Sequence, residues 1–158
     1  GNLRNVDAGD TVTFAIVVEN KGSGWKGAFD TVIKDSLPAG FVMPGGGWNL
    51  SVTDGTGAAL SFTDLGGGLF GNGIQLDDQS VSDGGIDAYS QSSGKNIAII
   101  TFDAKLVDAL AVPRALTNGA EVVSYAAKEG GINFGTDPEE ENPLNDIATV
   151  SVQPSLTK

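Results

Sequence analysis

Hydrophobic and polar residues alternate along two long segments of the chain, Thr11–Glu19 and Ile97–Leu106. In the first segment Val12, Phe14 and Ile16 fall on one face, and the residues between them fall on the other. This period of two is typical of a strand that is half-buried in an antiparallel sandwich. The second segment is nearly continuous in apolar residues, which indicates a central strand.

Six further segments are expected to be strands, and turn residues separate most of them. The eight predicted strands are Asn2–Val6, Thr11–Glu19, Ala28–Lys34, Trp48–Thr53, Ala58–Thr63, Ile97–Leu106, Ala120–Ala127 and Ile147–Val152. Val107–Leu116 has room for a single helical turn only, because Pro113 interrupts it. Many short strands joined by Gly-rich turns favour an all-β antiparallel sandwich.

A Gly- and Asp-rich insertion covers residues 44–95, and two of the predicted strands, Trp48–Thr53 and Ala58–Thr63, lie within it. It contains three consecutive glycines twice, at Gly45–Gly47 and at Gly66–Gly68. We expect its Gly55–Gly94 part to form an extended loop or an additional hairpin over one edge of the sandwich, where it would protect that edge from aggregation.

Four motifs resemble a known repeat. They are GD-x-V-x-F-x-I-x-V-x-N-x-G from Gly9, D-x-LPAGF from Asp35, LTNGAEVVSY at Leu116–Tyr125 and DIATVSV at Asp146–Val152. In this order they resemble the domain of unknown function eleven, the Ig-like repeat of large bacterial surface proteins and adhesins. The resemblance implies an Ig-like β-sandwich that acts as a cell-surface spacer or adhesive module, and it supplies no catalytic residues.

The resemblance also implies a domain division. We expect one Ig-like domain over residues 1–153, with the insertion at 44–95. The tail at residues 154–158 reads P-x-L-x-K, which resembles the linker towards a following repeat of a tandem array. A frayed chain end is the alternative interpretation.

Composition argues against an enzyme. The 158 residues contain no Cys and no His, which excludes disulfides, zinc-thiolate sites, thiol nucleophiles and the Ser–His–Asp triad. A pair of carboxylates could still perform acid–base chemistry, as in glycosidases, but no spacing in the chain selects such a pair. We therefore predict a non-catalytic protein.

The formal charge of −11, from 20 acidic and 9 basic residues, narrows the choice of partners. Nucleic acids and anionic membranes both require a basic surface, so neither is expected as a partner. No apolar run approaches the length of a membrane span. An acidic surface instead favours solubility and divalent cations such as Ca²⁺.

The densest group of oxygen ligands lies between Thr136 and Asp146, which gives a first candidate calcium site. Its residues are Asp137, Glu139, Glu141, Asn142 and Asp146. Calcium takes six to eight oxygens, so these side chains would need backbone carbonyls as well. A solvated acidic loop held open by self-repulsion is the alternative.

Further aspartates give weaker calcium candidates. The second choice is Asp77, Asp78 and Asp83, which lack the spacing of an EF-hand and are equally well explained by Asx turns. Asp7 and Asp10 are expected at one pole of the sandwich, together with Asp35. There they could bind calcium at a domain junction, or simply cap backbone N–H groups of a turn.

The two tryptophans have different expected roles. Trp25 lies in a Gly/Lys loop at the opposite pole and is a candidate platform for a sugar or protein partner, with packing over an apolar rim as the alternative. Trp48 follows a Gly run and is expected to pack in the core or over its edge.

Some surface-protein sandwiches that resemble this chain form a Lys–Asn isopeptide cross-link beside a buried acid. The candidates for it are Lys34 with Asn145 or Asn118, assisted by Asp103 or Glu121. The period-two pattern does not turn all of these side chains inward, so exposed residues without a cross-link are the favoured interpretation.

Together these observations predict a non-catalytic structural and adhesive repeat of a large bacterial cell-surface protein. Its partners would be neighbouring repeats of the same chain and a surface protein or glycan, in an extracellular location. The alternative is a calcium-dependent carbohydrate-binding module that uses Trp25 and the Asp137–Asp146 segment.

Overall fold

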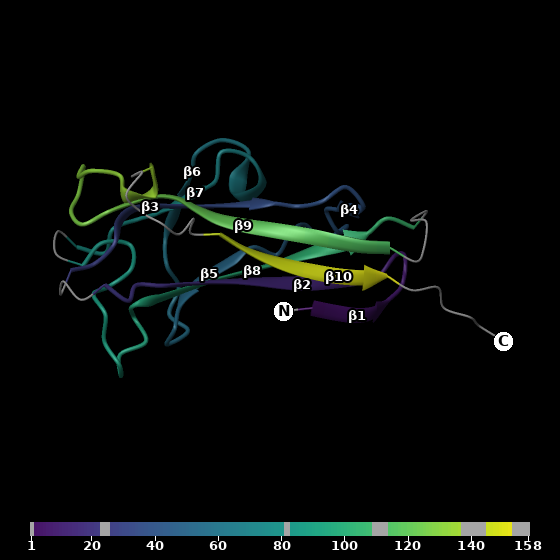
Figure 1. Ribbon diagram of the computed structural model, residues 1–158, viewed down its shortest axis with the longest axis horizontal. Coiled ribbons are helices and arrows are strands. Elements are labelled where there is room, and N and C mark those ends of the chain that lie inside the picture. The colour runs from purple at the N-terminus through teal and green to yellow at the C-terminus, as the bar shows by residue number, and fades with distance from the viewer. Residues whose placement is uncertain (1, 23–25, 81–82, 109–113, 137–144, 153–158) are drawn as a thin grey trace.

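The computed structural model describes residues 2–22, 26–80, 83–108, 114–136 and 145–152, and within them the chain forms β-strands and two short 3-10 helices. The elements are β1 (Asn2–Val6), β2 (Thr11–Glu19), β3 (Phe29–Ser36), β4 (Phe41–Val42), β5 (Ser51–Asp54), β6 (Phe62–Asp64), η1 (Gly68–Phe70), β7 (Ile74–Leu76), β8 (Ile97–Leu106), β9 (Arg114–Ala126), η2 (Phe134–Thr136) and β10 (Asn145–Val152). The long strands run along the long axis of an elongated molecule (Figure 1). The predicted all-β class is confirmed.

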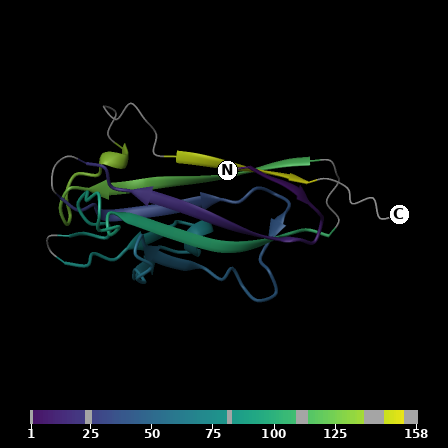
Figure 2. The same cartoon turned by 90° about the horizontal axis from the view of Figure 1, so that it is seen from below.

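The strands form two sheets that pack face to face as a sandwich (Figure 2). The six-stranded sheet has the order β1-β10-β9-β3-β7-β6, in which β1 and β10 are parallel and the other neighbours are antiparallel. The four-stranded sheet has the order β2-β8-β4, and β5 pairs with β8 on the same side as β4. The chain thus crosses between the sheets several times, as expected of a sandwich.

The core lies between the sheets and follows the period-two pattern. Every second residue of β8 is buried: Ala98, Ile100, Phe102, Ala104 and Leu106. The Phe102 ring stacks on Phe14 of β2 at a centroid distance of 5.2 Å and meets Phe70 edge-on at 5.0 Å. Trp48 lies 4.5 Å from Phe70 and packs against this core, as predicted.

Residues 44–95 belong to both sheets. The β6–β7 hairpin forms one edge of the six-stranded sheet itself. The preceding strand, β5, belongs to the four-stranded sheet instead. Six apolar side chains of this part of the chain are buried in the core: Val52, Leu60, Leu69, Ile74, Leu76 and Ile86. The insertion therefore completes the sandwich rather than lying over it.

Three predicted strands start at the wrong residue, by three residues or more. They are Trp48–Thr53 for β5 (Ser51–Asp54), Ala58–Thr63 for β6 (Phe62–Asp64) and Ala120–Ala127 for β9 (Arg114–Ala126). The strand β9 begins at Arg114, six residues before the predicted start. The helical turn predicted before Pro113 lies mostly outside the described residues and stays a prediction. In this part of β9 the side chains of Leu116 and Asn118 are buried and the strand pairs with β10. The strands β4 and β7 were missed, because two or three residues are too few to show a period.

Candidate functional site

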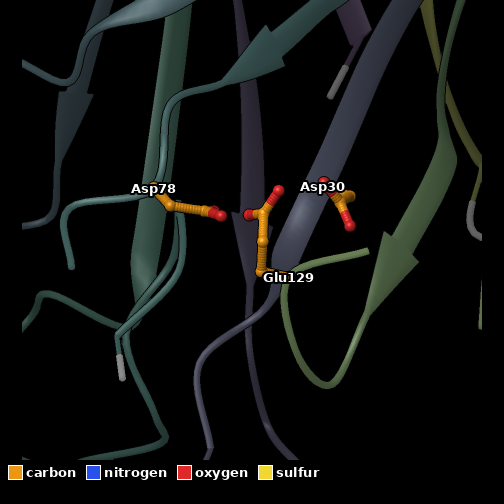
Figure 3. Close-up of side chains that lie close together, drawn as sticks. All are labelled: Asp30, Asp78 and Glu129. Atoms are coloured by element: carbon orange, nitrogen blue, oxygen red, sulfur yellow. The ribbon is translucent and has the colours of Figure 1, made fainter. Parts of the chain in front are cut away.

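Three carboxylates from distant parts of the sequence meet at the end of the sandwich where β9 finishes: Asp30, Asp78 and Glu129. Their ligand oxygens all lie within 4.8 Å of one another. The Glu129 side chain lies between those of Asp78 and Asp30 (Figure 3). We call these residues the acidic triad.

The strand order brings the triad together, because β3 lies between β7 and β9. Asp30 is in β3, Asp78 follows the end of β7 and Glu129 lies in the turn after β9. The pairing of β3 with β9 is irregular between Phe29 and Val32. Asp30 lies in this irregular part with a positive φ of 50°, and such bulges redirect a side chain out of the regular alternation.

Backbone hydrogen bonds hold the neighbouring segments in place. The segment that carries Asp78 is fixed to the start of β3, because the Gly85 N–H donates to the Ala28 carbonyl oxygen at 2.9 Å. The turn after β9 is fixed to the same strand, because the Gly130 N–H donates to Asp30 Oδ2 at 2.9 Å. Hydrogen bonds therefore hold the segments that carry the three acids in fixed positions.

Burial, together with the neighbouring acids, raises the pKa of Asp78 to about 7. Burial is the largest cause, followed by a hydrogen bond with Glu129 and by the charges of Glu129 and Asp30, while the Gly85 N–H opposes the shift. Two carboxyl groups can share a hydrogen bond only if one of them carries a proton. The acidic triad accordingly needs a proton or a cation to offset its charge.

The donor set of the triad can hold a hard cation. Its carboxylate oxygens are of the type that calcium and magnesium prefer. Asp78 Oδ1 is buried and has no hydrogen-bond partner among the described residues. Three side chains are fewer than the six to eight oxygens that calcium takes, so water or backbone carbonyls would complete the coordination shell.

Of the second-choice calcium set, only Asp78 belongs to the triad. The Asp77 carboxylate accepts a hydrogen bond from the Thr63 hydroxyl at 3.0 Å, and the Asp83 carboxylate accepts one from the Ser80 hydroxyl at 2.5 Å. These contacts are cross-strand and turn interactions. The structure does not bring the three aspartates to one point.

The first-choice calcium set and the predicted platform lie almost wholly outside the described residues: Asp137, Glu139, Glu141, Asn142 and Trp25. Asp146 is in β10, where its backbone pairs with that of Ala120. Both the calcium site in this segment and the role of Trp25 stay predictions.

Asp35 does not join Asp7 and Asp10, so the predicted grouping is wrong. Asp10 Oδ2 accepts a hydrogen bond from the Asp7 N–H at 2.9 Å, which is the simple turn contact. Asp35 instead points into the core from β3 and is 1% exposed. There its Oδ2 accepts a hydrogen bond of 2.7 Å from Asn118 Nδ2.

The Asp35 carboxyl group is buried but accepts only one hydrogen bond from the other side chains that the structure describes. Desolvation raises its pKa to about 6, and the hydrogen bond from Asn118 offsets only part of this effect. Asp35 Oδ1, Asn118 Oδ1 and Thr31 Oγ1 are all buried without a partner among the described residues. Protonation of Asp35 would remove the buried charge, which has only one donor in the described part of the chain, and would turn this carboxyl group into a donor.

The candidate isopeptide residues are not gathered in the core. Lys34, Glu121 and Asn145 share one row across β3, β9 and β10, and the side chain of Asn145 lies outside the described ones. Asn118 is inside beside Asp35, whereas Lys34 is the neighbour of Asp35 in β3 and therefore points away from the core. Asp103 faces solvent and bonds to exposed side chains, and Glu121 is exposed. No lysine is among the buried side chains that the structure describes.

Sequence reasoning missed Asp30 and Glu129. Neither residue lies in a motif, and the three acids of the triad are about fifty residues apart along the chain. Knowledge that β3 separates β7 from β9 would have indicated them, because the ends of neighbouring strands meet at the same edge of a sheet. The sequence alone does not give that order.

No known protein family and no curated protein matches this sequence. Solved structures do match. The major pilin subunit of Bacillus cereus superposes with a TM-score of 0.57 over 98% of this chain and 37% of its own, at 12% identity. The backbone pilin of Streptococcus pyogenes gives a TM-score of 0.52 over 93% of this chain and 32% of its own, at 15% identity.

A third match is the collagen-binding domain of a Staphylococcus aureus adhesin. It covers 89% of this chain and 87% of its own at 13% identity, with a TM-score of only 0.42. The chain spans about a third of the two pilin subunits. At these identities the likeness shows the fold: a sandwich like the Ig-like domains of bacterial pilins. The narrower assignment to the domain of unknown function eleven finds no family match.

Proposed function

We propose that this domain is a non-catalytic module of a large bacterial cell-surface protein, in which it acts as a spacer and takes part in adhesion. The observation that carries the proposal is the likeness to two pilin subunits, which extends over nearly the whole chain but only about a third of theirs. The Streptococcus pyogenes pilin has a modular three-domain structure. No helix among the described residues is long and apolar enough to cross a membrane.

The arrangement of the outermost strands of the chain supports the spacer role. β1 is parallel to β10 and pairs with it through Asn2, Leu3 and Val6. When the two ends of the chain are pulled apart, the start of β1 and the end of β10 move in opposite directions along their shared hydrogen bonds. These bonds are then loaded together in shear, whereas a hairpin pulled from one end would lose them one by one.

Single-molecule force measurement tests this role. We expect a higher unfolding force when the domain is pulled through its two chain ends than when it is pulled through its N-terminus and a cysteine at Thr149→Cys, the residue of β10 that pairs with Asn2. The second geometry unzips the β1–β10 pair. Forced unfolding depends on the unfolding barrier, so equal forces in the two geometries would contradict a tension-bearing role. Labelling of intact cells by an antibody to the domain tests the location.

A calcium-dependent carbohydrate-binding module is the second candidate, and the acidic triad is the observation that favours it. Calcium that binds only the folded state would raise the melting temperature of the wild-type domain. The rise should be smaller in Glu129→Gln and unchanged in Glu121→Gln, an exposed glutamate away from the triad. Glycan binding that persists in a chelator would count against this candidate.

A further inference from the structure

The nine-residue strand β2 is an open edge of the four-stranded sheet. It pairs only with β8, and its other side has no neighbouring strand among the described residues. Figure 2 views the molecule from the side on which β1 and β2 lie. Exposed edge strands of this length are sites at which another chain can add a strand.

Hydrogen bonds at both ends of β2 show which backbone groups face outward. The Asn20 N–H donates to the Asn96 carbonyl oxygen at 2.9 Å, and the Leu106 N–H donates to the Asp10 carbonyl oxygen at 2.8 Å. In an antiparallel pair such bonds recur at every second residue. The even-numbered residues of β2 therefore bond to β8, and the N–H and C=O groups of the odd-numbered residues point away from the sheet. These residues are Thr11, Thr13, Ala15, Val17 and Glu19.

The other sheet edges are protected. β1 has only five residues, its pairing register shifts between Leu3 and Val6, and Asn5 within it has a positive φ of 60°. β5 is covered by the segment that follows it, because the Leu60 N–H donates to the Val52 carbonyl oxygen at 3.0 Å. β6 has three residues.

None of these protective devices occurs in β2, which is straight in register and contains neither Pro nor Lys. Bulges, short length, Pro and Lys are the usual means of preventing strand addition at an edge. Val17, which is 62% exposed, adds an apolar side chain beside the open backbone groups. β2 is therefore the one edge among the described strands that is both long and unprotected.

The β2 edge is complementary to a second copy of itself. In an antiparallel pairing centred on Ala15, Ala15 meets its own copy, Thr13 meets Val17 and Thr11 meets Glu19. Each of these is a pair in which outward N–H and C=O groups of both strands exchange two hydrogen bonds. No like charges lie opposite each other, and a β-branched pair lies on either side of the centre, which is a favourable cross-strand arrangement.

We propose that two copies of this chain associate through antiparallel pairing of their β2 strands, centred on Ala15, so that the two four-stranded sheets form one continuous sheet. The partner is a second copy of this chain. A two-fold axis at Ala15 relates the two copies, so their long axes run in opposite directions. The inference does not depend on a cell-surface location, since it rests on the strand edge alone.

Disulfide trapping tests the pairing directly, because the chain has no Cys. Paired residues of this type lie about 5.5 Å apart between Cα atoms, within the range that a disulfide spans. Ala15→Cys should form a covalent dimer under mild oxidation. Ser51→Cys is the matched control, because Ser51 and Ala15 flank Thr101 in the same row across the sheet and both are exposed. Equal cross-linking rates in the two variants would overturn the proposal.

Sedimentation analysis measures the non-covalent dimer. Ala15→Lys places two ammonium groups opposite each other and should weaken association about fivefold or more. Ser51→Lys makes the same change in net charge and should not weaken it. Because each copy carries a formal charge of −11, salt should strengthen association. A wild-type protein that stays monomeric at high salt, or that forms only open-ended aggregates, would overturn the proposal.

Amide hydrogen exchange adds a readout at single residues. On raising the protein concentration, the amides of Thr13, Ala15 and Val17 should gain protection. Those of Phe14 and Ile16 should be protected at every concentration, because they already bond to β8. Odd-numbered amides that exchange at the same rate in dilute and concentrated samples would overturn the proposal even if a dimer forms.

Discussion

Asp35 and Asp54 are both almost fully inaccessible to solvent, at 1% and 3% exposed, yet their pKa values move in opposite directions. Burial raises the pKa of Asp35 to about 6. Hydrogen bonds, led by that of the Thr56 hydroxyl, lower the pKa of Asp54 below its ordinary value. The burial of a carboxyl group thus does not by itself decide whether that group is charged.

The difference lies in the donors. Asp54 Oδ1 accepts three hydrogen bonds from residues that follow it closely: from the Thr56 N–H at 2.8 Å, from the Thr56 hydroxyl at 2.6 Å and from the Ala58 N–H at 3.0 Å. Asp35 accepts one, from Asn118 on another strand. In a turn, several backbone N–H groups can donate to one carboxylate. In a sheet, the backbone N–H groups donate to the carbonyl oxygens of the neighbouring strand instead. The turn therefore stabilises a charge and the core does not.

Asp35→Asn is the substitution with the largest expected effect. The pKa of Asp35 in the folded state is about 6, above its ordinary value of 3.8. Its contribution to stability is thus fully present below pH 3.8 and is lost as the pH rises through 6. The amide that replaces the carboxylate has no charge to bury, so at pH 8 the variant should be more stable than the wild type by about 3 kcal/mol.

Urea unfolding at pH 8 and at pH 3.5 measures this effect. Near pH 3.5 the two proteins should differ little, because Asp35 is then neutral. The control is Asp103→Asn, on the outer face of β8, which should give no gain at pH 8. A variant that is no more stable than the wild type at pH 8 would show that Asp35 is not desolvated in solution.

Asp54→Ala is expected to have the next largest effect, with the opposite sign. It removes three hydrogen bonds to a charged acceptor, and we expect a loss of about 2 kcal/mol at pH 7. Because the folded-state pKa of Asp54 is lowered, its contribution is present above pH 3.8 and is lost as the pH falls through the folded value. Thermal or urea unfolding at pH 7 measures the loss.

Asp54→Asn separates the hydrogen bonds from the charge. It keeps an acceptor oxygen for the turn, so it should cost less than Asp54→Ala. An equal loss in the two variants would show that the charge of Asp54, and not its number of hydrogen bonds, distinguishes it from Asp35.

The two aspartates also show how far the sequence leads. The hydrogen bonds of Asp54 are local, although no motif indicated this residue. Alternation over nine or ten residues predicted β2 and β8 with their observed bounds, because it fixes both the strand and its buried face. Asp35 was expected at a pole with Asp7, since it stands just before Leu37-Pro38. Its position inside the core depends on pairing with β9, which is a contact over 83 residues.

The candidate site depends on the same kind of distant contact. Asp78 drew attention because it lies in an Asp-rich segment, but the residues that define its surroundings, Asp30 and Glu129, carry no such signal. They meet only because β3 separates β7 from β9 in the sheet. A period of two predicts that a strand exists and which face is buried, but it does not give the order of strands.

Glu129→Gln is expected to have the smallest effect, and it extends the comparison to an acid surrounded by other acids. The pKa of Asp78 is about 7 when folded, so its contribution to stability falls as the pH rises from below 3.8 through 7. The substitution removes one negative charge and introduces an amide donor, so the pKa of Asp78 should fall and stability should depend less on pH between 6 and 8. The change should be smaller than for Asp35, because Asp78 is partly exposed to solvent, which screens the charges.

Melting temperatures at pH 6 and 8 measure this change against Glu121→Gln, which alters the net charge equally but lies away from the triad. The wild type and Glu121→Gln should lose more stability between these pH values than Glu129→Gln does. If both variants lose the same amount of stability between pH 6 and 8, Glu129 does not raise the pKa of Asp78. The number of hydrogen-bond donors would then be the one difference between the buried acids of this domain that affects their charge.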